Sequence, residues 1–389
     1  MRRADPRFRP NPNRAVYVQG TIDQALVDTL TPRILGLQHQ DHEPITVYVD
    51  SRGGGTASAE LILRLLRATD QDGSAPVWIV TVATGRAASA AADLLSAGDY
   101  ALAYPETILH LHGVRYSFDD PLTMEAASFM ADSLKVGNDH YAFTLARRCI
   151  ARFILRFLTL RPEFEAARTR FEQQHGEQLD DLGCLFIALS DIVSSPKTTR
   201  IIKQAFSRYN RYQQLLAAVG ASVGNDPNSG GSRRLAETEA AILQAILTFE
   251  VSTNTEPGWS FKEQGLRQLQ DDFLLLGEYL GRQQNQPLED LCERWGDFFL
   301  TEIDQAEIQQ QPEQERDKER LERLRVALRP IWFFFVALCH ALQEGENELS
   351  AHDAYWLGLI DEIIGDDSLP CTRMFVEFDP ENHSDQTTV

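Results

Sequence analysis

The sequence contains few cysteines, no long apolar run and no recognisable leader. Its five cysteines are widely spaced and form no C-x-x-C pair, which argues against a disulfide framework or structural zinc and favours a reducing compartment. The most apolar run, IWFFFVALCHAL at 331–342, has 12 residues, whereas a membrane-spanning helix needs about 20. The basic start leads into prolines and not into an apolar segment, so no signal peptide is expected. We therefore expect a cytoplasmic protein with no membrane span.

Positive charge is also scarce. Acidic residues outnumber basic ones by 57 to 37, giving a net charge of −20, which argues against nucleic-acid binding. The exception is MRRADPRFRPNPNR (1–14), whose five arginines and three prolines predict a flexible arm. Neither G-x-G-x-x-G nor G-x-x-x-x-G-K-[ST] occurs, so no phosphate-binding loop is indicated. We expect no cofactor and no metal.

Residues 15–112 alternate between two hydrophobic periods. Runs with strand character are followed by runs with helical spacing, a pattern typical of an α/β layer built from right-handed crossovers. Strands are expected at 15–20, 45–50, 75–83, 100–104 and 107–112, and helices at 21–40, 56–69 and 87–98.

Beyond about residue 121 the pattern becomes helical, beginning with a long helix or two joined helices over 121–158. The run at 331–342 predicts a buried helix. The last patterned segment, 346–366, reads as a short amphipathic helix followed by a strand-like run and is too short to fold alone. The predicted domains are a flexible arm (1–14), an α/β core (15–149), an inserted, mostly helical domain (150–342), a return to the core (343–366) and a polar tail (367–389).

Three segments of the predicted α/β core contain residues suited to catalysis or ligand binding. In VDSRGGGTA, three glycines after a strand permit positive φ and let a backbone N–H approach a ligand closely, although they also suit a turn made only for packing. In TGRAASAAADLLSAG, Ser89 falls at the first turn of a predicted helix. A serine there can be a nucleophile on a tight strand-to-helix bend, as in a nucleophile elbow, or simply a small residue among alanines.

The third segment, PETILHLHGV, places His110 and His112 on one face of a strand. Such a pair is compatible with structural packing, with metal binding or with a general base. No third metal ligand is identified nearby, and a general base requires a serine partner, which Ser89 provides 23 residues earlier.

Together these segments resemble the proteolytic subunit of the Clp protease. The family pattern runs from a strand and N-S-P-G-G through a helix to G-x-A-A-S, and then to a proline followed by M-I-H-Q-P. Here VYVDSRGGG matches the first motif with Asp50 and Arg52 in place of asparagine and proline, and TGRAASAAADLLSAG matches the second. SLKVGNDHYAFTL resembles the family's handle helix, and ELSAHDAYWLGLIDEIIG its closing segment. The resemblance covers residues 15–149 and 343–366, and implies a Clp/crotonase-like fold.

The resemblance implies a serine endopeptidase with assigned site residues. Ser89 would attack the scissile carbonyl and His112, seven places after the proline, would take its proton. The N–H groups of Gly54 and Ala90 would form the oxyanion hole. His110 stands where the family usually has an apolar residue.

The third member of the triad departs from the family. The family aspartate corresponds here to Glu346, with Glu344 and Glu348 as competing candidates, and the acidic run QEGENE could instead be only a solvated turn. The resemblance further implies a peptide or protein substrate, a homo-oligomer and an ATP-dependent unfoldase partner. The arginine arm replaces the family's N-terminal axial-loop segment and first helix, which puts that partner in question.

Two other function classes remain open at the level of sequence. One is a catalytically inactive Clp-like scaffold or interaction protein, which the missing aspartate allows. The other is an acyl-CoA enzyme of the related crotonase fold, which the G-x-A-A-S motif and the serine–histidine spacing disfavour.

Overall fold

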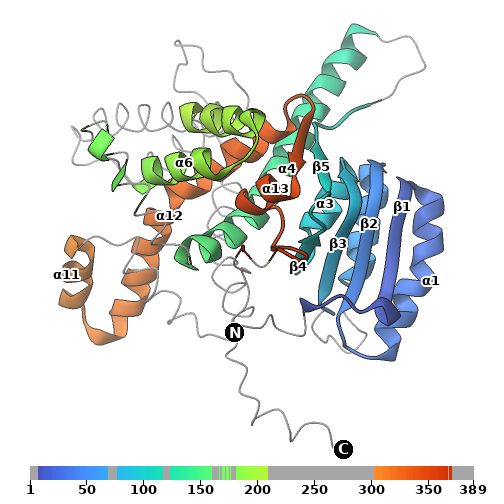
Figure 1. Cartoon of the computed structure of the whole chain (residues 1–389), viewed down its shortest axis with the longest axis horizontal. Helices are drawn as coiled ribbons and strands as arrows, with labels where there is room; N and C mark the ends of the chain where they lie inside the picture. The colour runs from blue at the N-terminus through green and yellow to red at the C-terminus, as the bar shows by residue number, and fades with distance from the viewer. Residues whose placement is uncertain are drawn as a thin grey trace, which may run out of the picture. The chain divides into compact units, whose positions relative to one another are not determined.

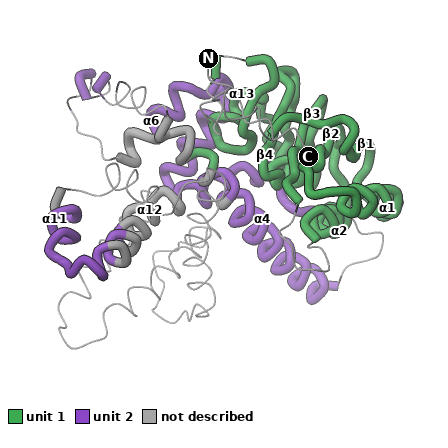
Figure 2. The backbone as a smooth tube through the Cα atoms, turned by 90° about the horizontal axis from the view of Figure 1, so that it is seen from below, with its two compact units in different colours: residues 1–111, 152–162, 346–389 green, residues 112–151, 163–345 purple. Residues whose placement is uncertain are grey.

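The computed structural model describes residues 8–68, 77–116, 123–159, 181–208 and 302–366, with a few residues at 166–176 and 368–369. Its two compact units are coloured in Figure 2. Unit 1 comprises residues 1–111, 152–162 and 346–389, and unit 2 comprises 112–151 and 163–345. Much of the expected helical insertion and nearly all of the expected polar tail lie outside the described residues.

Unit 1 is built on a seven-stranded, mostly parallel sheet (Figure 1). Five strands follow the order β1-β2-β3-β4-β7, while β5 pairs with β3 and with β6 off this path. The β5–β6 pair is antiparallel, and the other pairings described are parallel. The strands are β1 (Ala15–Ile22), β2 (Ile45–Gly54), β3 (Ile79–Ala88), β4 (Tyr100–Ala103), β5 (Ile108–Leu111), β6 (Asn347–Ser350) and β7 (Glu362–Ile363). The predicted α/β class is confirmed.

Three helices of unit 1 pack on one another and on the sheet: α1 (Gln24–Gln40), α2 (Thr56–Leu66) and α3 (Ala90–Ser96). Helix α1 is capped at its N-terminus by Asp23, whose Oδ1 accepts a hydrogen bond from the Leu26 N–H at 3.0 Å. Its buried positions recur at helical spacing, which is why this segment reads as a helix from sequence. They are Val27, Leu30, Ile34 and Leu37.

The two faces of the sheet are covered differently, as strand β3 shows. Thr81 donates a hydrogen bond of 2.6 Å to the carbonyl of Leu95, so this side of the strand faces α3. Val82, one residue on, points to the opposite face, where it packs with Phe8 and Tyr100. The Phe8 ring is 3% exposed and stacks on Tyr100 with ring centroids 4.7 Å apart. The second half of the arginine-rich arm is therefore part of the folded unit.

The return segment adds two strands and a helix to unit 1. Strand β6 pairs with β5, α13 (Ala351–Trp356) follows, and β7 pairs with β4. The hydroxyl of Ser350 caps α13 by accepting a hydrogen bond from the Asp353 N–H at 3.1 Å. Strand β6 was not predicted from the sequence, because four residues are too few for a period-2 pattern to be distinguished.

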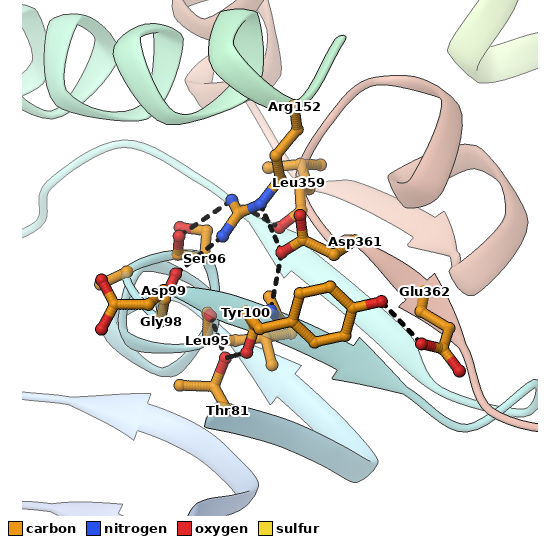
Figure 3. Close-up of polar contacts among 12 residues, drawn as sticks. Thr81, Leu95, Ser96, Gly98, Asp99, Tyr100, Arg152, Leu359, Asp361 and Glu362 are labelled. Carbon is orange, nitrogen blue, oxygen red and sulfur yellow. Dashed lines mark hydrogen bonds and ion pairs between the residues drawn. The ribbon is translucent and has the colours of Figure 1, made fainter. Parts of the chain in front are cut away.

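A buried ion pair joins this return segment to the end of helix α4 (Met124–Thr159) (Figure 3). Arg152 Nε lies 2.8 Å from Asp361 Oδ2, and both side chains are almost fully buried. Asp361 Oδ2 also accepts the Ala101 N–H at 2.7 Å, which ties the pair to β4. The other guanidinium N–H groups donate to the carbonyls of Ser96, Gly98 and Leu359. Because the buried charges have partners on both sides, this network meets the condition for a stable buried pair.

The described part of unit 2 is helical. It contains most of α4, then α6 (Asp181–Ile192), a helix at 196–208, α11 (Glu302–Gln310) and α12 (Glu313–Gln343). Phe186 and Phe206 stack with ring centroids 4.1 Å apart, which joins α6 to the following helix. The predicted helices at 121–158 and 331–342 are confirmed, and residues 334–339 of α12 are buried.

A polar cluster in unit 2 surrounds His340 of α12. Its Nδ1 lies 3.0 Å from Glu344 Oε1, and its Nε2 lies 3.5 Å from Asp139 Oδ1 in α4. Arg208 donates to both Glu344 oxygens at 2.8 Å. Burial by itself lowers the pKa of His340, but its contacts with Asp139 and Glu344 outweigh burial and raise the pKa above the ordinary 6.5.

Glu344 shows the opposite shift. Burial by itself raises the pKa of this carboxyl, but the hydrogen bond with His340 and the charge of Arg208 outweigh burial and lower the pKa below the ordinary 4.5. Both pKa shifts favour the charged forms, so the cluster is most stable when His340 is protonated and Glu344 is ionised.

Two further findings concern the described residues. None of the helices described is long and apolar enough to cross a bilayer. Cys149 and Cys339 are buried and carry free thiols.

Candidate active site

Ser89 stands at the junction of β3 and α3 in an unusual backbone conformation. Its φ is 55° and ψ is −129°, and it is the non-glycine residue with positive φ in the described part of the chain. Such a conformation costs on the order of 1–3 kcal/mol and persists only where the surroundings enforce it. A strained serine between a strand and a helix is the arrangement of a nucleophile elbow, in which the hydroxyl projects from a sharp turn.

Backbone hydrogen bonds hold this turn on both sides. The Ser89 N–H donates to the carbonyl of His110 in β5 at 2.7 Å. The Ser89 carbonyl in turn accepts the N–H groups of Ala92 and Asp93 at 2.8 and 3.3 Å. The N–H of Ala90 lies in the first turn of α3, where amides have no acceptor within the helix. The donor predicted at Ala90 therefore sits next to the serine at a position typical of oxyanion binding.

The glycines at the end of β2 lie directly against the serine turn. Gly53 has a φ of 87°, and a Cβ placed on it would come within 2.7 Å of Ser89 Cβ and would collide with the Ala88 carbonyl. Gly54 has a φ of 156°, and a Cβ there would collide with the backbone of Ile22. These two positions require glycine for close approach as well as for conformation. Gly54, the second predicted oxyanion donor, therefore directly follows Gly53, the residue that lies against Ser89.

Asp50 and Arg86 form the polar surroundings of the turn. Asp50 Oδ1 accepts the Arg86 N–H at 3.0 Å, and a Cβ on Gly85 would lie 2.8 Å from the same oxygen. Since this interaction needs only an acceptor oxygen, an aspartate can serve where the Clp pattern has asparagine.

The two histidines of the third motif differ in their surroundings. His110 belongs to β5, is 18% exposed, and its Nε2 lies 2.7 Å from Glu346 Oε2. His112 follows the strand, and its Nδ1 lies 2.7 Å from the carbonyl oxygen of Gly113. A carbonyl oxygen can only accept a hydrogen bond, so this contact requires the proton on Nδ1. That tautomer leaves a lone pair on Nε2, as a general base needs.

The three candidate glutamates of QEGENE have separate partners. Glu344 is bound by Arg208 and His340 in unit 2. Glu348 in β6 contacts Arg86, with 2.6 Å between Oε1 and the guanidinium nitrogen. Glu346, just before β6, contacts His110, within two residues of His112.

The His110–Glu346 contact was not predicted. Its two members come from segments far apart in the chain, and they meet because β5 and β6 are antiparallel with His110 opposite Glu348. Two features of the sequence could have indicated this contact: the histidine at 110 in addition to His112, and Glu346 directly before a strand.

Residues 5–117 match the family model described as Clp protease. Over these residues the chain is similar to the Clp protease family. The matched range includes β1 to β5 and therefore the Ser89 turn, the glycines of β2 and both histidines. The resemblance inferred from the motifs is thereby confirmed, together with the Clp/crotonase-like fold class. A search of curated proteins returned no match.

Proposed function

We propose that the protein is a serine endopeptidase of the Clp type that hydrolyses peptide bonds through Ser89, His112 and Glu346. The observation that carries this proposal is the strained conformation of Ser89 within the segment that matches the Clp protease family model. A packing serine needs no such conformation, since the residue that precedes a helix normally adopts the β region, as Asp23 and Ser350 do before α1 and α13.

The proposed mechanism assigns one role to each residue. Ser89 Oγ attacks the carbonyl carbon of the scissile bond while His112 Nε2 accepts its proton. The Ser89 N–H donates a hydrogen bond to the His110 carbonyl, so Ser89 lies against His110. His112 is two residues further along the chain, and the Cα of His112 is therefore at most about 7 Å from the Cα of His110. The Gly54 and Ala90 N–H groups would stabilise the oxyanion of the tetrahedral intermediate.

His112 then donates its proton to the leaving amine, which gives an acyl-enzyme on Ser89. Water, deprotonated by the same histidine, releases the acid product and restores the serine. Glu346 orients the imidazole and stabilises its cation during both steps.

The test is covalent labelling with a fluorophosphonate probe, together with cleavage of an unstructured peptide. Ser89→Ala should abolish labelling, and His112→Ala should slow it about 10³-fold or more, because an unactivated hydroxyl is a weak nucleophile. Glu346→Ala should slow labelling about 10²- to 10⁴-fold. Ser128→Ala is the matched control, since Ser128 is an exposed serine of α4.

The result also decides between function classes. A wild type that stays unlabelled, under conditions where a control serine hydrolase reacts, would replace this proposal with the inactive scaffold. Labelling confined to Ser89 would exclude both the scaffold and an acyl-CoA enzyme, because neither needs an activated serine.

We further propose that the protein works in the cytoplasm as a homo-oligomer, as the family relationship suggests. Sedimentation velocity at several protein concentrations tests the assembly: a single species at the mass of one chain throughout the range would contradict it.

A further inference from the structure

A row of side chains crosses the face of the unit 1 sheet that lies opposite α3. Thr81 faces α3, so Val82 and the residues beside it in the neighbouring parallel strands point to the opposite face. The strand register sets the order of this row, which is Tyr17, Tyr48, Val82, Leu102 and Glu362. The row is therefore aromatic at one end, aliphatic in the middle and acidic at the other end.

Phe8, in the segment before β1, packs on the middle of this row. Its ring stacks on Tyr100 and meets the Trp78 ring edge-on, with centroids 5.7 Å apart. Such ring pairs gain stability beyond the area that they bury. The other apolar residues packed in the same cluster are Tyr48, Val80, Val82, Leu102 and Ile364. This part of the sheet thus forms an apolar surface that accommodates an aromatic side chain.

Arg9 and Asn11 hold the same segment through polar groups. Arg9 Nη1 lies 2.8 Å from Glu362 Oε1, and the other Glu362 oxygen accepts the Tyr100 hydroxyl at 2.7 Å (Figure 3). The Asn11 N–H donates to Thr46 Oγ1 at 2.8 Å. Residues 8–11, called the strap below, therefore place a ring on the apolar middle of the row and a guanidinium at its acidic end.

The strap is held less firmly than the residue at which β1 begins. The Arg9 side chain is 47% exposed, so its ion pair is weakened by solvent. Arg14, by contrast, is buried and donates to backbone carbonyls within 37–43. A chain end held by a few side chains opens locally far more often than the whole domain unfolds. Opening of the strap ahead of Arg14 would uncover the apolar surface under Phe8.

The aromatic end of the row is partly exposed. Tyr17 stacks on Tyr48 with ring centroids 5.2 Å apart and is 49% exposed, and Tyr104, a further neighbour of Tyr48, is 43% exposed. Parallel sheets are normally covered on both faces. Within the described residues of unit 1, the strap covers the middle of this face and leaves these tyrosines accessible, so the apolar surface continues beyond the strap.

We propose that the strap is a displaceable internal ligand, and that the surface beneath it binds a peptide segment in which an aromatic residue is followed by a basic one. The strap itself defines this chemistry, since its ring packs on Tyr100 and its guanidinium pairs with Glu362. A closed strap competes with such a segment, so the apparent affinity falls with the fraction of open molecules. The strap is thus an autoinhibitory contact, and the inference concerns binding alone, independently of the serine site.

The test measures binding of a fluorescent peptide, FRPNPNR (residues 8–14), to the full chain by fluorescence anisotropy. Phe8→Ala and Arg9→Ala together remove the competing side chains and should tighten binding about 10-fold over the wild type, as expected if the strap is closed about 90% of the time. A peptide with alanine in place of its phenylalanine should bind about 10-fold or more weakly, because the apolar surface then stays uncovered.

The role of charge is tested in the same double variant. Adding Glu362→Gln should weaken peptide binding about 2- to 5-fold at low salt and less at high salt, as expected of a solvent-exposed ion pair. Glu60→Gln is the matched control, since Glu60 is an acid of α2 that pairs with an exposed arginine, and it should leave binding unchanged.

Hydrogen exchange of the wild type provides a measurement without substitutions. If the strap opens alone, the Asn11 amide should exchange about 100-fold or more faster than the amides of β2, although it is hydrogen-bonded to Thr46.

Three results would overturn the inference. Peptide binding no tighter in the double variant than in the wild type would show that the strap masks no binding surface. Asn11 exchange as slow as that of β2, or a double variant that does not fold, would make Phe8 an ordinary core residue. Tight binding that Glu362→Gln leaves unchanged would contradict the basic residue assigned to the partner.

Discussion

Gly53 and Gly54 leave no room for a side chain beside the serine turn. Each has positive φ, and a Cβ on either would meet backbone atoms of a neighbouring strand or of the turn itself. Backbone cannot move aside as a flexible side chain can, so the end of β2 and the Ser89 turn are locked in one arrangement.

Replacing Gly54 with alanine should therefore lower the free energy of unfolding by at least about 2 kcal/mol, from backbone collision and from strain at positive φ. Gly36→Ala is the matched control, because Gly36 lies inside α1 with nothing within 4 Å of its added Cβ. That change should stabilise the protein by about 0.5–1 kcal/mol. Urea denaturation of both variants measures the contrast, and equal effects would show that the close approach at Gly54 does not matter.

At this scale the sequence was informative where a motif is local. G-x-A-A-S and the glycine run identify Ser89 and its neighbours, because strand, turn and helix follow within a few residues. The sequence did not reveal that Glu346 contacts His110 or that Asp50 accepts the Arg86 N–H, because those contacts depend on strand pairings between distant segments.

Among the elements, the end of helix α4 and the return segment depend on each other through Arg152 and Asp361. Removing one partner leaves a buried charge without compensation, which typically costs 3–5 kcal/mol. Removing an exposed pair costs far less.

Arg152→Met should accordingly lower the free energy of unfolding by about 3–5 kcal/mol, measured by chemical denaturation. The control is Arg64→Met in α2, which loses an exposed contact with Glu60 at 3.6 Å and should cost less than about 1 kcal/mol. Similar losses in the two variants would mean that the buried network contributes little.

The His340 cluster makes the contacts among α4, α12 and the helix at 196–208 depend on pH. Because the pKa of His340 is raised in the folded state, its stabilising contribution is fully present below the unfolded value of 6.5 and is lost as pH rises through the folded value. The difference in unfolding free energy between wild type and His340→Gln should shrink with rising pH over this range. A constant difference from about pH 5 to 9 would contradict the assignment.

Within the same cluster, the contribution of Glu344 to stability changes with pH in the opposite direction. Its pKa is lowered, so its contribution is present above the ordinary 4.5 and is lost as pH falls through the folded value. Glu344→Gln should therefore differ most from the wild type near neutral pH and least in strong acid.

Most elements of the first 160 residues could be predicted, since long segments with a regular hydrophobic period, such as α1 and α4, are recognisable in the sequence. The short strand β6 could not, although it supplies the partner of β5. Its pairing is set by tertiary contacts and leaves almost no local pattern.

For the whole molecule, composition and the order of motifs were enough to predict an α/β core of the Clp/crotonase type. They could not define how the rest of the chain is divided. Helix α4 runs through Arg152, where the structure changes from unit 2 to unit 1, so one uninterrupted helical pattern crosses the division. A boundary inside a helix produces no proline, glycine or polar break in the sequence.

The separation of Arg152 from Asp361 has a consequence for biosynthesis. The two lie 209 residues apart, and Glu346 also belongs to the later segment. At 5–20 residues per second, a ribosome needs about 10–40 s to reach Asp361 after adding Arg152. During that interval the nascent chain already contains Ser89 and both histidines but lacks Glu346, β6 and Asp361, the partner of the buried Arg152. The proposed site is therefore incomplete until the segment that contains Glu346 and Asp361 has been translated.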